Sequence, residues 1–460
     1  MRVIICGAGR VGQGIAERLA AEGNDVSVID TSSQLIQAIK DRLDVRGFVG
    51  HGAHPDVLAR AGAADADMLV AVTLYDEVNM VACQLAHSVF NIDRKIARVR
   101  AQSYLDPKYS TLFAAEHMPI DNIISPELEV GKMVIRRIAL PGATDAVRFA
   151  DNSISMLAIE CDEDCPVVNT PLDQLTELFP DLNATVVGVW RNNSMFIPHA
   201  TDQLRVGDLA YVIVDRQQVA RALSLFGHEE IEAQRIVIAG GGNIGLYVAR
   251  VLEERETNRV RVKIIEATRE RAVSIADELK KTVVLHGDAL DQEIMTEAGI
   301  ESADLLVTLT NDDQVNILAS VMAKRLGCKT NLALLNNPSY HGFTRTLGID
   351  SFINPRTVTV SKVLQHVRQG RVEAVHSVQG GAAEVIEATA LETSMLLNAP
   401  LRELDLPENT RIGAVYRNGK VLMPSGDMRI KANDRVIVFV EQSSVKRVER
   451  LFSVALAYSG

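Results

Sequence analysis

Two short glycine-rich segments contain the residues of this chain that best suit the binding of a phosphate-bearing ligand. They share the spacing GxGxxG, with Gly7, Gly9 and Gly12 near the start of the chain and Gly240, Gly242 and Gly245 in its second half. The first glycine permits a tight turn from strand to helix, the second lets a pyrophosphate approach the backbone, and the third lets helix and strand pack closely. The anion would lie against free amides at the positive end of the helix. Each segment therefore predicts a nucleotide-binding turn.

An acidic residue ends the next predicted strand in each copy. Asp30 lies 18 residues beyond the third glycine of the first turn, and Glu266 lies 21 residues beyond that of the second. A carboxylate at this place accepts hydrogen bonds from ribose hydroxyls and disfavours a 2'-phosphate, which favours NAD over NADP. In the second copy, contact between Arg269 and a phosphate leaves NAD and another adenine nucleotide both open.

The two turns differ at the residue after the second glycine. This residue is Arg10 in the first copy and Asn243 in the second. Contact of Arg10 with a phosphate and plain exposure to solvent are both open. The two sites therefore need not bind the same ligand.

The histidines do not form a repeated catalytic set. A dehydrogenase of this fold needs a base or proton relay near the nicotinamide. Only His51 and His286 lie near one another in the two copies, and alignment on Gly50 and Gly287 places His51 opposite Asp288. Turn residues beside a nucleotide explain this pattern better than catalysis does.

The cysteines predict no metal site. Cys161 and Cys165 lie in CDEDC, but no second Cys or His pair follows at zinc-site spacing. We interpret them as two thiols near the end of a strand. The five cysteines are an odd and scattered set, which suits a reducing compartment.

Composition predicts a cytoplasmic globular protein of several domains. The 460 residues are 47% hydrophobic and 23% charged, and no apolar run approaches the ~20 residues that a membrane span needs. The first residues lack the pattern of a secretory signal, so we do not expect export. A net charge of -11 argues against nucleic acid as a partner.

The chain is a tandem duplication, because residues 1–228 align with residues 233–460. Thr73 pairs with Thr310, and Asn79 pairs with Asn316. The period is far longer than that of solenoid repeats, so each copy should be a complete pair of domains.

Each copy predicts a Rossmann-like domain followed by a smaller module. Apolar runs alternate with amphipathic stretches, which indicates a parallel sheet covered on both faces. Short alternating strands and a terminal helix follow, with a hairpin signal at RNG in the second copy. The fold class is therefore α/β, with two tandem Rossmann-like parallel-sheet domains, each followed by a small α+β C-terminal domain. The predicted boundaries are 1–124 and 233–353 for the Rossmann-like domains, 125–144 and 354–371 for a crossover helix, and 145–228 and 372–456 for the small domains.

The crossover helices begin with good capping residues and carry an apolar stripe. Ser125 and Asn354 suit the N-cap, and a proline follows each of them. The stripe consists of Val134, Ile135 and Ile138 in the first copy and Val363, Leu364 and Val367 in the second. We expect it to pack on the sheet of its own copy, with a subunit interface as the alternative.

These repeated features resemble tandem RCK (KTN) domains: strand, GxGxxG, terminal acid, the segments AVTLYDEVNM and TLTNDDQVNI, and a small C-terminal module. The whole chain, including GHGAHPDVL and DEVNMVACQLA, is similar to the NAD-binding regulatory proteins of Trk potassium uptake systems. The resemblance implies a cytoplasmic protein that is peripheral to the inner face of the cell membrane and attached to a potassium channel subunit of the TrkH or TrkG type. It also implies a ring, commonly a homotetramer, in which NAD(H) and adenine nucleotides such as ATP and ADP set channel activity.

The resemblance also implies the nucleotide contacts of each site. In the first site these are Gly7, Gly9, Arg10, Val11, Asp30, His51, Thr73 and Arg100. In the second they are Gly240, Gly242, Asn243, Ile244, Glu266, Asp288 and Thr310. The chain departs from the family pattern at His51, where an acid is usual, and at Asn336, which answers Arg100.

The favoured mechanism is linkage without turnover. A ligand that binds one arrangement of the ring more tightly than another shifts their populations by its differential affinity. The alternatives are a soluble NAD-dependent oxidoreductase and a structural dimerisation protein with empty glycine turns.

Overall fold

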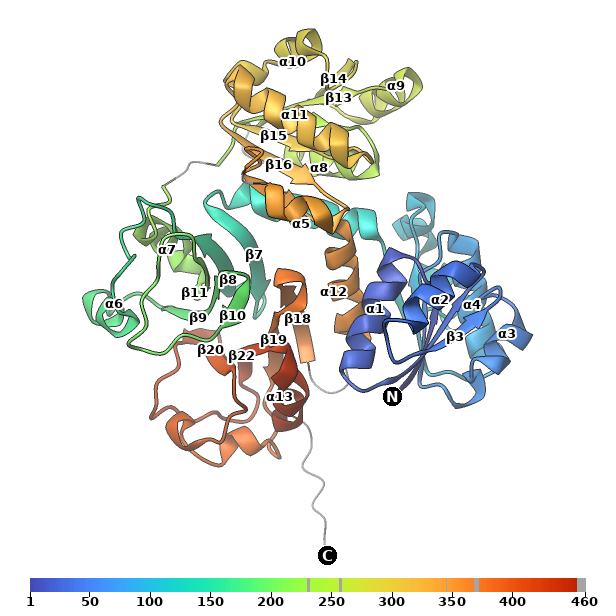
Figure 1. Cartoon of the computed structure of the whole chain (residues 1–460), viewed down its shortest axis with the longest axis horizontal. Helices are drawn as coiled ribbons and strands as arrows, with labels where there is room; N and C mark the ends of the chain where they lie inside the picture. Colours follow the sequence, from blue (N-terminus) through green and yellow to red (C-terminus); the bar gives the residue numbers. More distant parts are fainter. Residues whose placement is uncertain (230–231, 256–258, 345, 368–371, 453–460) are drawn as a thin grey trace, which may run out of the picture. The chain divides into compact units, whose positions relative to one another are not determined.

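The computed structural model describes residues 1–229, 232–255, 259–344, 346–367 and 372–452 (Figure 1). It divides into two compact units, and each unit takes one piece from each copy. The first unit combines Met1–Met133 with Arg235–Val367, and the second combines Val134–Gln234 with Arg368–Gly460. The predicted ends of the second crossover helix at 371 and of the second small domain at 456 lie outside the described residues.

The first Rossmann-like domain is a parallel sheet in the order β3-β2-β1-β4-β5-β6. Its strands are β1 (Arg2–Cys6), β2 (Asp25–Asp30), β3 (Arg46–Val49), β4 (Met68–Ala71), β5 (Arg94–Arg98) and β6 (Asn122–Ile124). Its helices are α1 (Arg10–Ala21), α2 (Ser33–Lys40), α3 (Pro55–Arg60) and α4 (Asp76–Ser88). Separate apolar clusters cover the two faces of the sheet, which is why β1 and β4 are apolar almost throughout.

The second Rossmann-like domain repeats this order as β14-β13-β12-β15-β16-β17. Its strands are β12 (Arg235–Ala239), β13 (Arg261–Glu266), β14 (Val283–His286), β15 (Leu305–Thr308), β16 (Thr330–Leu334) and β17 (Ser351–Ile353). Its helices are α8 (Asn243–Glu253), α9 (Arg269–Glu278), α10 (Gln292–Ala298) and α11 (Asp313–Leu326).

The two small domains are antiparallel sheets with equivalent strand orders, β10-β9-β11-β8-β7 and β18-β19-β22-β20-β21. We call them the first and second module. The first contains β7 (Ala143–Phe149), β8 (Ile154–Glu160), α6 (Leu172–Leu178), β9 (Ala184–Arg191), β10 (Ser194–Phe196), β11 (Leu209–Asp215) and α7 (Val219–Leu225). The second contains β18 (Val372–Val378), β19 (Ala383–Thr389), β20 (Thr410–Arg417), β21 (Lys420–Leu422), β22 (Arg435–Glu441) and α13 (Val445–Phe452). The predicted fold class is confirmed.

The hairpin predicted at RNG is the turn between β20 and β21. Asn418 and Gly419 both have positive φ, 49° and 79°, and Arg417 pairs with Lys420. Two central residues with positive φ match the twist of the flanking strands, which is why Asn-Gly suits this turn.

The crossover helices correct one expectation from the sequence. Helix α12 (Pro355–Val367) does not bury its stripe only against its own copy. Val363, Leu364 and Val367 belong to the core of the first Rossmann-like domain, where α12 packs along α1 (Figure 1). Gly14 of α1 allows this close approach, because a Cβ there would lie 3.0 Å from a methyl group of Val360. The stripe was visible in the sequence, but its partner was not.

Helix α5 (Pro126–Ala139) approaches the other copy in the same way. A Cβ at Gly131 would lie 2.4 Å from Cδ1 of Tyr247, which belongs to α8 of the second Rossmann-like domain. Each crossover helix therefore contacts the first helix of the opposite copy.

Candidate nucleotide-binding sites

The first glycine of each turn has a backbone that only glycine adopts easily. Gly7 and Gly240 have φ of +110° and +109°. A Cβ at Gly7 would lie 3.0 Å from the amide nitrogen of Thr73, and a Cβ at Gly240 would lie 3.0 Å from that of Thr310. The turn therefore packs directly against the segment that follows β4 or β15.

The third and second glycines of each turn differ in how closely other atoms surround them. A Cβ at Gly12 would lie 1.8 Å from the carbonyl oxygen of Gly7, and a Cβ at Gly245 would lie 2.1 Å from that of Gly240. At Gly9 and Gly242, by contrast, a Cβ would meet nothing within 4 Å. These two residues are the N-caps of α1 and α8, and as glycines they have no side chain that could cap the first amides of either helix. The open space in front of these amides can take an anion.

The acid at the end of the second strand closes onto the glycine turn. The carboxylate of Asp30 accepts hydrogen bonds from the amides of Ala8 at 2.7 Å and Ser32 at 2.8 Å. The carboxylate of Glu266 accepts from the amides of Gly241 and Thr268, both at 2.8 Å. Because a carboxylate offers about four acceptor positions, each acid keeps capacity for ribose hydroxyls.

The third strands place His51 and Asp288 at equivalent positions. The amide of Gly50 donates to the carbonyl of Asp30, and the amide of Gly287 donates to that of Glu266. His51 follows the first glycine, and its Nδ1 accepts from the amide of Ala53 at 3.3 Å. Asp288 follows the second, and its carboxylate accepts from the amide of Leu290 at 2.9 Å. His286 lies one residue before Gly287, at the end of β14, and so two residues before Asp288.

A fully buried asparagine positions each threonine of the candidate sites. The side-chain oxygen of Asn79 accepts from the amide and the hydroxyl of Thr73, at 2.8 and 2.7 Å. Asn316 holds Thr310 in the same way, at 3.0 and 2.7 Å. The sequence alignment paired these asparagines without giving them a role. The Asn six residues after the Thr in both copies was the available signal.

The end of β5 carries two arginines that the second copy lacks. Arg100 bonds through Nε to Glu127 at 2.7 Å. Asn79 bonds to the carbonyl of Arg98 and Asn316 to that of Leu334, so Leu334 is the counterpart of Arg98. The Nε of Arg98 is buried without a hydrogen-bond partner among the described residues, and burial together with Arg100 lowers its pKa. Arg98 is not among the residues predicted from the sequence, although IARVRAQ places it two residues from Arg100 on the same side of the chain.

The second site has a cation of its own. Arg269, which the sequence analysis considered for phosphate contact, is exposed at the start of α9. Arg271, which it missed, donates from Nε to the carbonyl of Gly241 at 2.9 Å. Leu35 occupies the equivalent place in α2, five residues after the acid. The side chains around the turns therefore differ in charge. Arg10 and Asn243 are exposed, and Val11 and Ile244 are half-buried.

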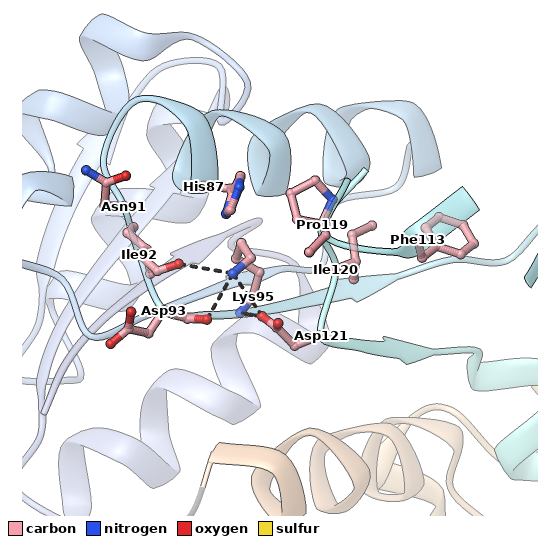
Figure 2. Close-up of a pocket in the computed structure, with 10 residues that line it drawn as sticks. His87, Asn91, Ile92, Asp93, Lys95, Phe113, Pro119, Ile120 and Asp121 are labelled. Carbon is pink, nitrogen blue, oxygen red and sulfur yellow. Dashed lines mark hydrogen bonds and ion pairs between the residues drawn. The ribbon is translucent and has the colours of Figure 1, made fainter. Parts of the chain in front are cut away.

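A hollow of ≈ 340 Å³ lies at the opposite edge of the first sheet (Figure 2). Lys95 is buried there near the start of β5, and its ammonium group bonds to the carbonyls of Ile92 and Asp93 and to the carboxylate of Asp121. These three partners use its three donors. Lys324 bonds Asp350 in the second copy in a comparable way, at 3.1 Å. We interpret the hollow as the surroundings of a structural lysine and not as a ligand site, because ligands of such sheets bind at the carboxyl ends of the strands.

The cysteines are buried and unbridged. Cys161 and Cys165 lie side by side near the end of β8, and their thiols share a hydrogen bond. This bond lowers the pKa of Cys165 and raises that of Cys161. Among the described residues, no cluster of three or more His, Cys, Asp or Glu side chains is arranged to hold a metal ion. No helix in this part of the chain has both the length and the apolar character to cross a membrane.

Comparison with solved structures finds chains of the same fold. The GsuK RCK domain superposes with a TM-score of 0.59 at 17% identity, over 98% of this chain and 94% of that one. The GsuK channel bound to NAD superposes with a TM-score of 0.60 at 17% identity, over 98% of this chain and 78% of that one.

Comparison with known sequences identifies the family. The TrkA-N domain model matches residues 3–126 and 236–355, and the TrkA-C domain model matches residues 156–227 and 385–453. The Trk system potassium uptake protein TrkA of Azorhizobium caulinodans is 57% identical over 458 residues and that of Halomonas elongata is 40% identical over 462, each across 100% of both chains. TrkA of Vibrio alginolyticus is 37% identical across 98% of both chains. Because both domain models match in both copies and the relatives align from end to end, the chain belongs to the TrkA family of Trk system potassium uptake proteins.

Proposed function

We propose that this protein is a cytoplasmic nucleotide-binding regulatory subunit that gates a Trk-type potassium uptake channel. The observation that carries the proposal is the pair of glycine turns, each with open space before unprotected helix amides and a carboxylate beside it. This chemistry suits an adenine dinucleotide or a nucleoside polyphosphate. The relatives named as Trk potassium uptake proteins supply the transport system.

The ligands are NAD(H) and, at one or both sites, ATP or ADP. A GsuK channel of the same fold has been solved bound to NAD, which supports NAD as a ligand here. The contacts we propose are the residues predicted from the sequence, with Gly12 and Gly245 as the packing positions of the two turns. The domain boundaries given above remain our proposal for the limits of the four domains.

The partner is a TrkH- or TrkG-type membrane subunit, and the protein is a homo-oligomeric ring, a tetramer, at the inner face of the cell membrane. Nucleotide binding shifts the ring between arrangements by differential affinity, and a few kcal/mol suffices to bias an attached pore. Two unlike sites in one chain allow two nucleotide signals to be compared.

Thermal shift with NAD, NADH, ATP and ADP tests the proposal. A ligand at 100 times its Kd should stabilise its domain by about 2.7 kcal/mol. Asp30→Ala and Glu266→Ala should each reduce this shift for the ligand of one site. Asp44→Ala and Asp277→Ala, which remove exposed acids of the same two domains, serve as controls. If neither Asp30→Ala nor Glu266→Ala changes any shift, the site assignment is wrong.

Turnover separates the regulator from the oxidoreductase alternative. The regulator binds NADH without consuming it and co-purifies with its membrane partner. Steady oxidation of NADH by a small metabolite at enzymatic rates would instead favour the oxidoreductase. An absence of any ligand-dependent shift would favour a structural protein with empty turns.

A further inference from the structure

The first and second modules share a single apolar core. Val147 and Ile213 of the first module belong to the same buried cluster as Val385 and Phe439 of the second. Strand β20 lies against β9 and β11 (Figure 1), and the rings of Tyr211 and Phe439 are 5.7 Å apart. The two sheets therefore pack face to face within one chain.

The strand registers identify equivalent positions in the two modules. The first strand of each has a bulge at the same place, between Ala143 and Asp145 in β7 and between Val372 and Ala374 in β18. Asp145 is therefore equivalent to Ala374, and Val147 is equivalent to His376.

A second bulge defines the equivalent positions in β9 and β20. It leaves Val187 unpaired in the first module and Gly413 unpaired in the second. Gly188 is consequently equivalent to Ala414. Counting along the next strand makes Ile213 equivalent to Phe439.

Charge makes the two sides of this interface unlike. Nε2 of His376 lies 2.8 Å from the carboxylate of Asp145, and the two side chains are 12% and 20% exposed. In a pair of two first modules, the symmetry-related position opposite Asp145 would hold Val147 in place of His376. Asp145 would keep the nearby Arg137 but lose the histidine that hydrogen-bonds it, and a largely buried carboxylate that loses a partner to an apolar side chain is destabilised.

Shape makes the two sides unlike as well. A Cβ at Gly188 would lie 2.4 Å from Cζ of Phe439. A Cβ at Gly413 would lie 2.1 Å from Cδ1 of Ile213 and 3.0 Å from a methyl group of Val187. Each glycine therefore makes room for a large side chain of the other module.

Pairs of identical modules lose this fit. Val187 and Gly413 are equivalent and face each other, so they lie at the pseudo-twofold axis. Two first modules would bring Val187 against Val187 and Ile213 against Val187. Two second modules would bring Phe439 against Ala414, where there is no glycine to receive the ring.

We infer that this interface is specific for unlike modules: the first module accepts a second module, from its own chain or from another copy, and rejects another first module. Copies of this chain that exchange modules during assembly can therefore do so only by pairing a first with a second. The inference concerns assembly and does not depend on whether the glycine turns bind nucleotide.

Disulfide trapping in the full-length protein tests this inference. The Asp145→Cys/His376→Cys variant should form a disulfide under mild oxidation with diamide, seen on a non-reducing gel as a shifted monomer or a covalent dimer. The Val187→Cys variant keeps Asp145 and places a cysteine at the pseudo-twofold axis, where it would meet its own equivalent only between two first modules. It should give no more covalent dimer than wild type, whose five cysteines are all buried. Covalent dimer from this second variant, or no disulfide from the first, overturns the inference.

A packing exchange provides an independent measurement if a cysteine variant does not fold. Gly188→Ala should lower the Tm of the protein by several degrees, because the new methyl group meets the ring of Phe439. The double variant Gly188→Ala/Phe439→Leu should recover most of that loss, whereas Phe439→Leu alone should lower the Tm. Coupling of this kind is expected only for residues in contact. Additive losses would mean that Gly188 and Phe439 do not meet in solution, which contradicts the unlike pairing. Ala414→Gly is the matched control, and it should not rescue Gly188→Ala.

Discussion

The two nucleotide-binding sites differ in their side chains far more than in their backbone. Both copies keep the left-handed first glycine, the acid that closes on the turn, and the buried asparagine that holds a threonine. The charged groups around these elements differ, with Arg98 and Arg100 in the first copy and Arg271 in the second. Duplication has therefore retained the residues that shape the turn and changed the charged residues beside it.

Substitution of the third glycine should be the most damaging change, and equally so in both copies. Gly12→Ala places a methyl group 1.8 Å from the carbonyl of Gly7, and Gly245→Ala places one 2.1 Å from that of Gly240. Because the obstacle is backbone, we expect a loss of about 3 kcal/mol or more in the free energy of unfolding. Urea denaturation measures it. Gly9→Ala and Gly242→Ala are the controls, since they should leave stability nearly unchanged while weakening nucleotide binding. Equal losses at Gly9 and Gly12 would contradict the assigned geometry.

Removal of the buried asparagines should also affect both copies alike. Asn79→Ala and Asn316→Ala each leave a buried amide and two carbonyls without their partner. We expect each to cost about 2 to 3 kcal/mol of stability. Urea denaturation with and without nucleotide measures the cost and the loss of affinity at the neighbouring site. A large effect in only one copy would show that the two sites are built differently.

Exchange of Arg100, which we propose as a ligand contact, should change the first site alone. Arg100→Asn gives the first copy the residue of the second, and we expect affinity for a nucleoside triphosphate to fall about fivefold, which corresponds to ~1 kcal/mol. Isothermal titration with ATP and NAD measures it. The reverse variant Asn336→Arg should raise ATP affinity at the second site. Unchanged ATP affinity in both variants would show that Arg100 does not contact the nucleotide.

The smallest expected effect is a pH-dependent loss of stability on substitution of Glu253 in the second copy. Burial opposes ionisation of Glu253, but hydrogen bonds from the amides of Lys280, Lys281 and Thr282 and from the Thr282 hydroxyl outweigh it and lower the pKa. A carboxyl whose pKa is lower in the folded state stabilises the fold above its unfolded pKa, and this contribution disappears as pH falls through the folded value. Glu253→Gln should therefore lower stability by less than about 1 kcal/mol at pH 7 and by a smaller amount at pH 3. Thermal denaturation at both pH values checks this against the exposed neighbour control Glu254→Gln.

The sequence predicted those parts of the sites that depend on local chemistry. Gly7, Gly12 and Asp30 can be recognised because a strand, a tight turn and a helix follow one another directly along the chain. The second copy carries the same pattern in its own segment, so its glycine turn could be recognised independently of the first. The fold class followed from the alternation of apolar runs with amphipathic stretches, and the structure confirms it.

The sequence did not predict contacts that depend on tertiary structure. Arg271 reaches back to the turn from the following helix, and its spacing from Glu266 belongs to no general motif. Arg98 looks like any strand residue until its burial is known. The stripe on α12 identified an apolar face, but periodicity does not say which of two equivalent sheets will cover it. The roles of these residues remain predictions, as do the ligand contacts of both sites.

The position of α12 bears on how a doubled gene of this kind can arise and persist. Val363 and Leu364 complete the core of the first Rossmann-like domain, although they are encoded more than a hundred residues after the first copy ends. A polypeptide ending with that copy would expose an apolar surface that only another molecule could cover. A single, unfused copy would accordingly have needed a second chain in order to fold. Fusion places both copies in one polypeptide, so their association no longer depends on protein concentration.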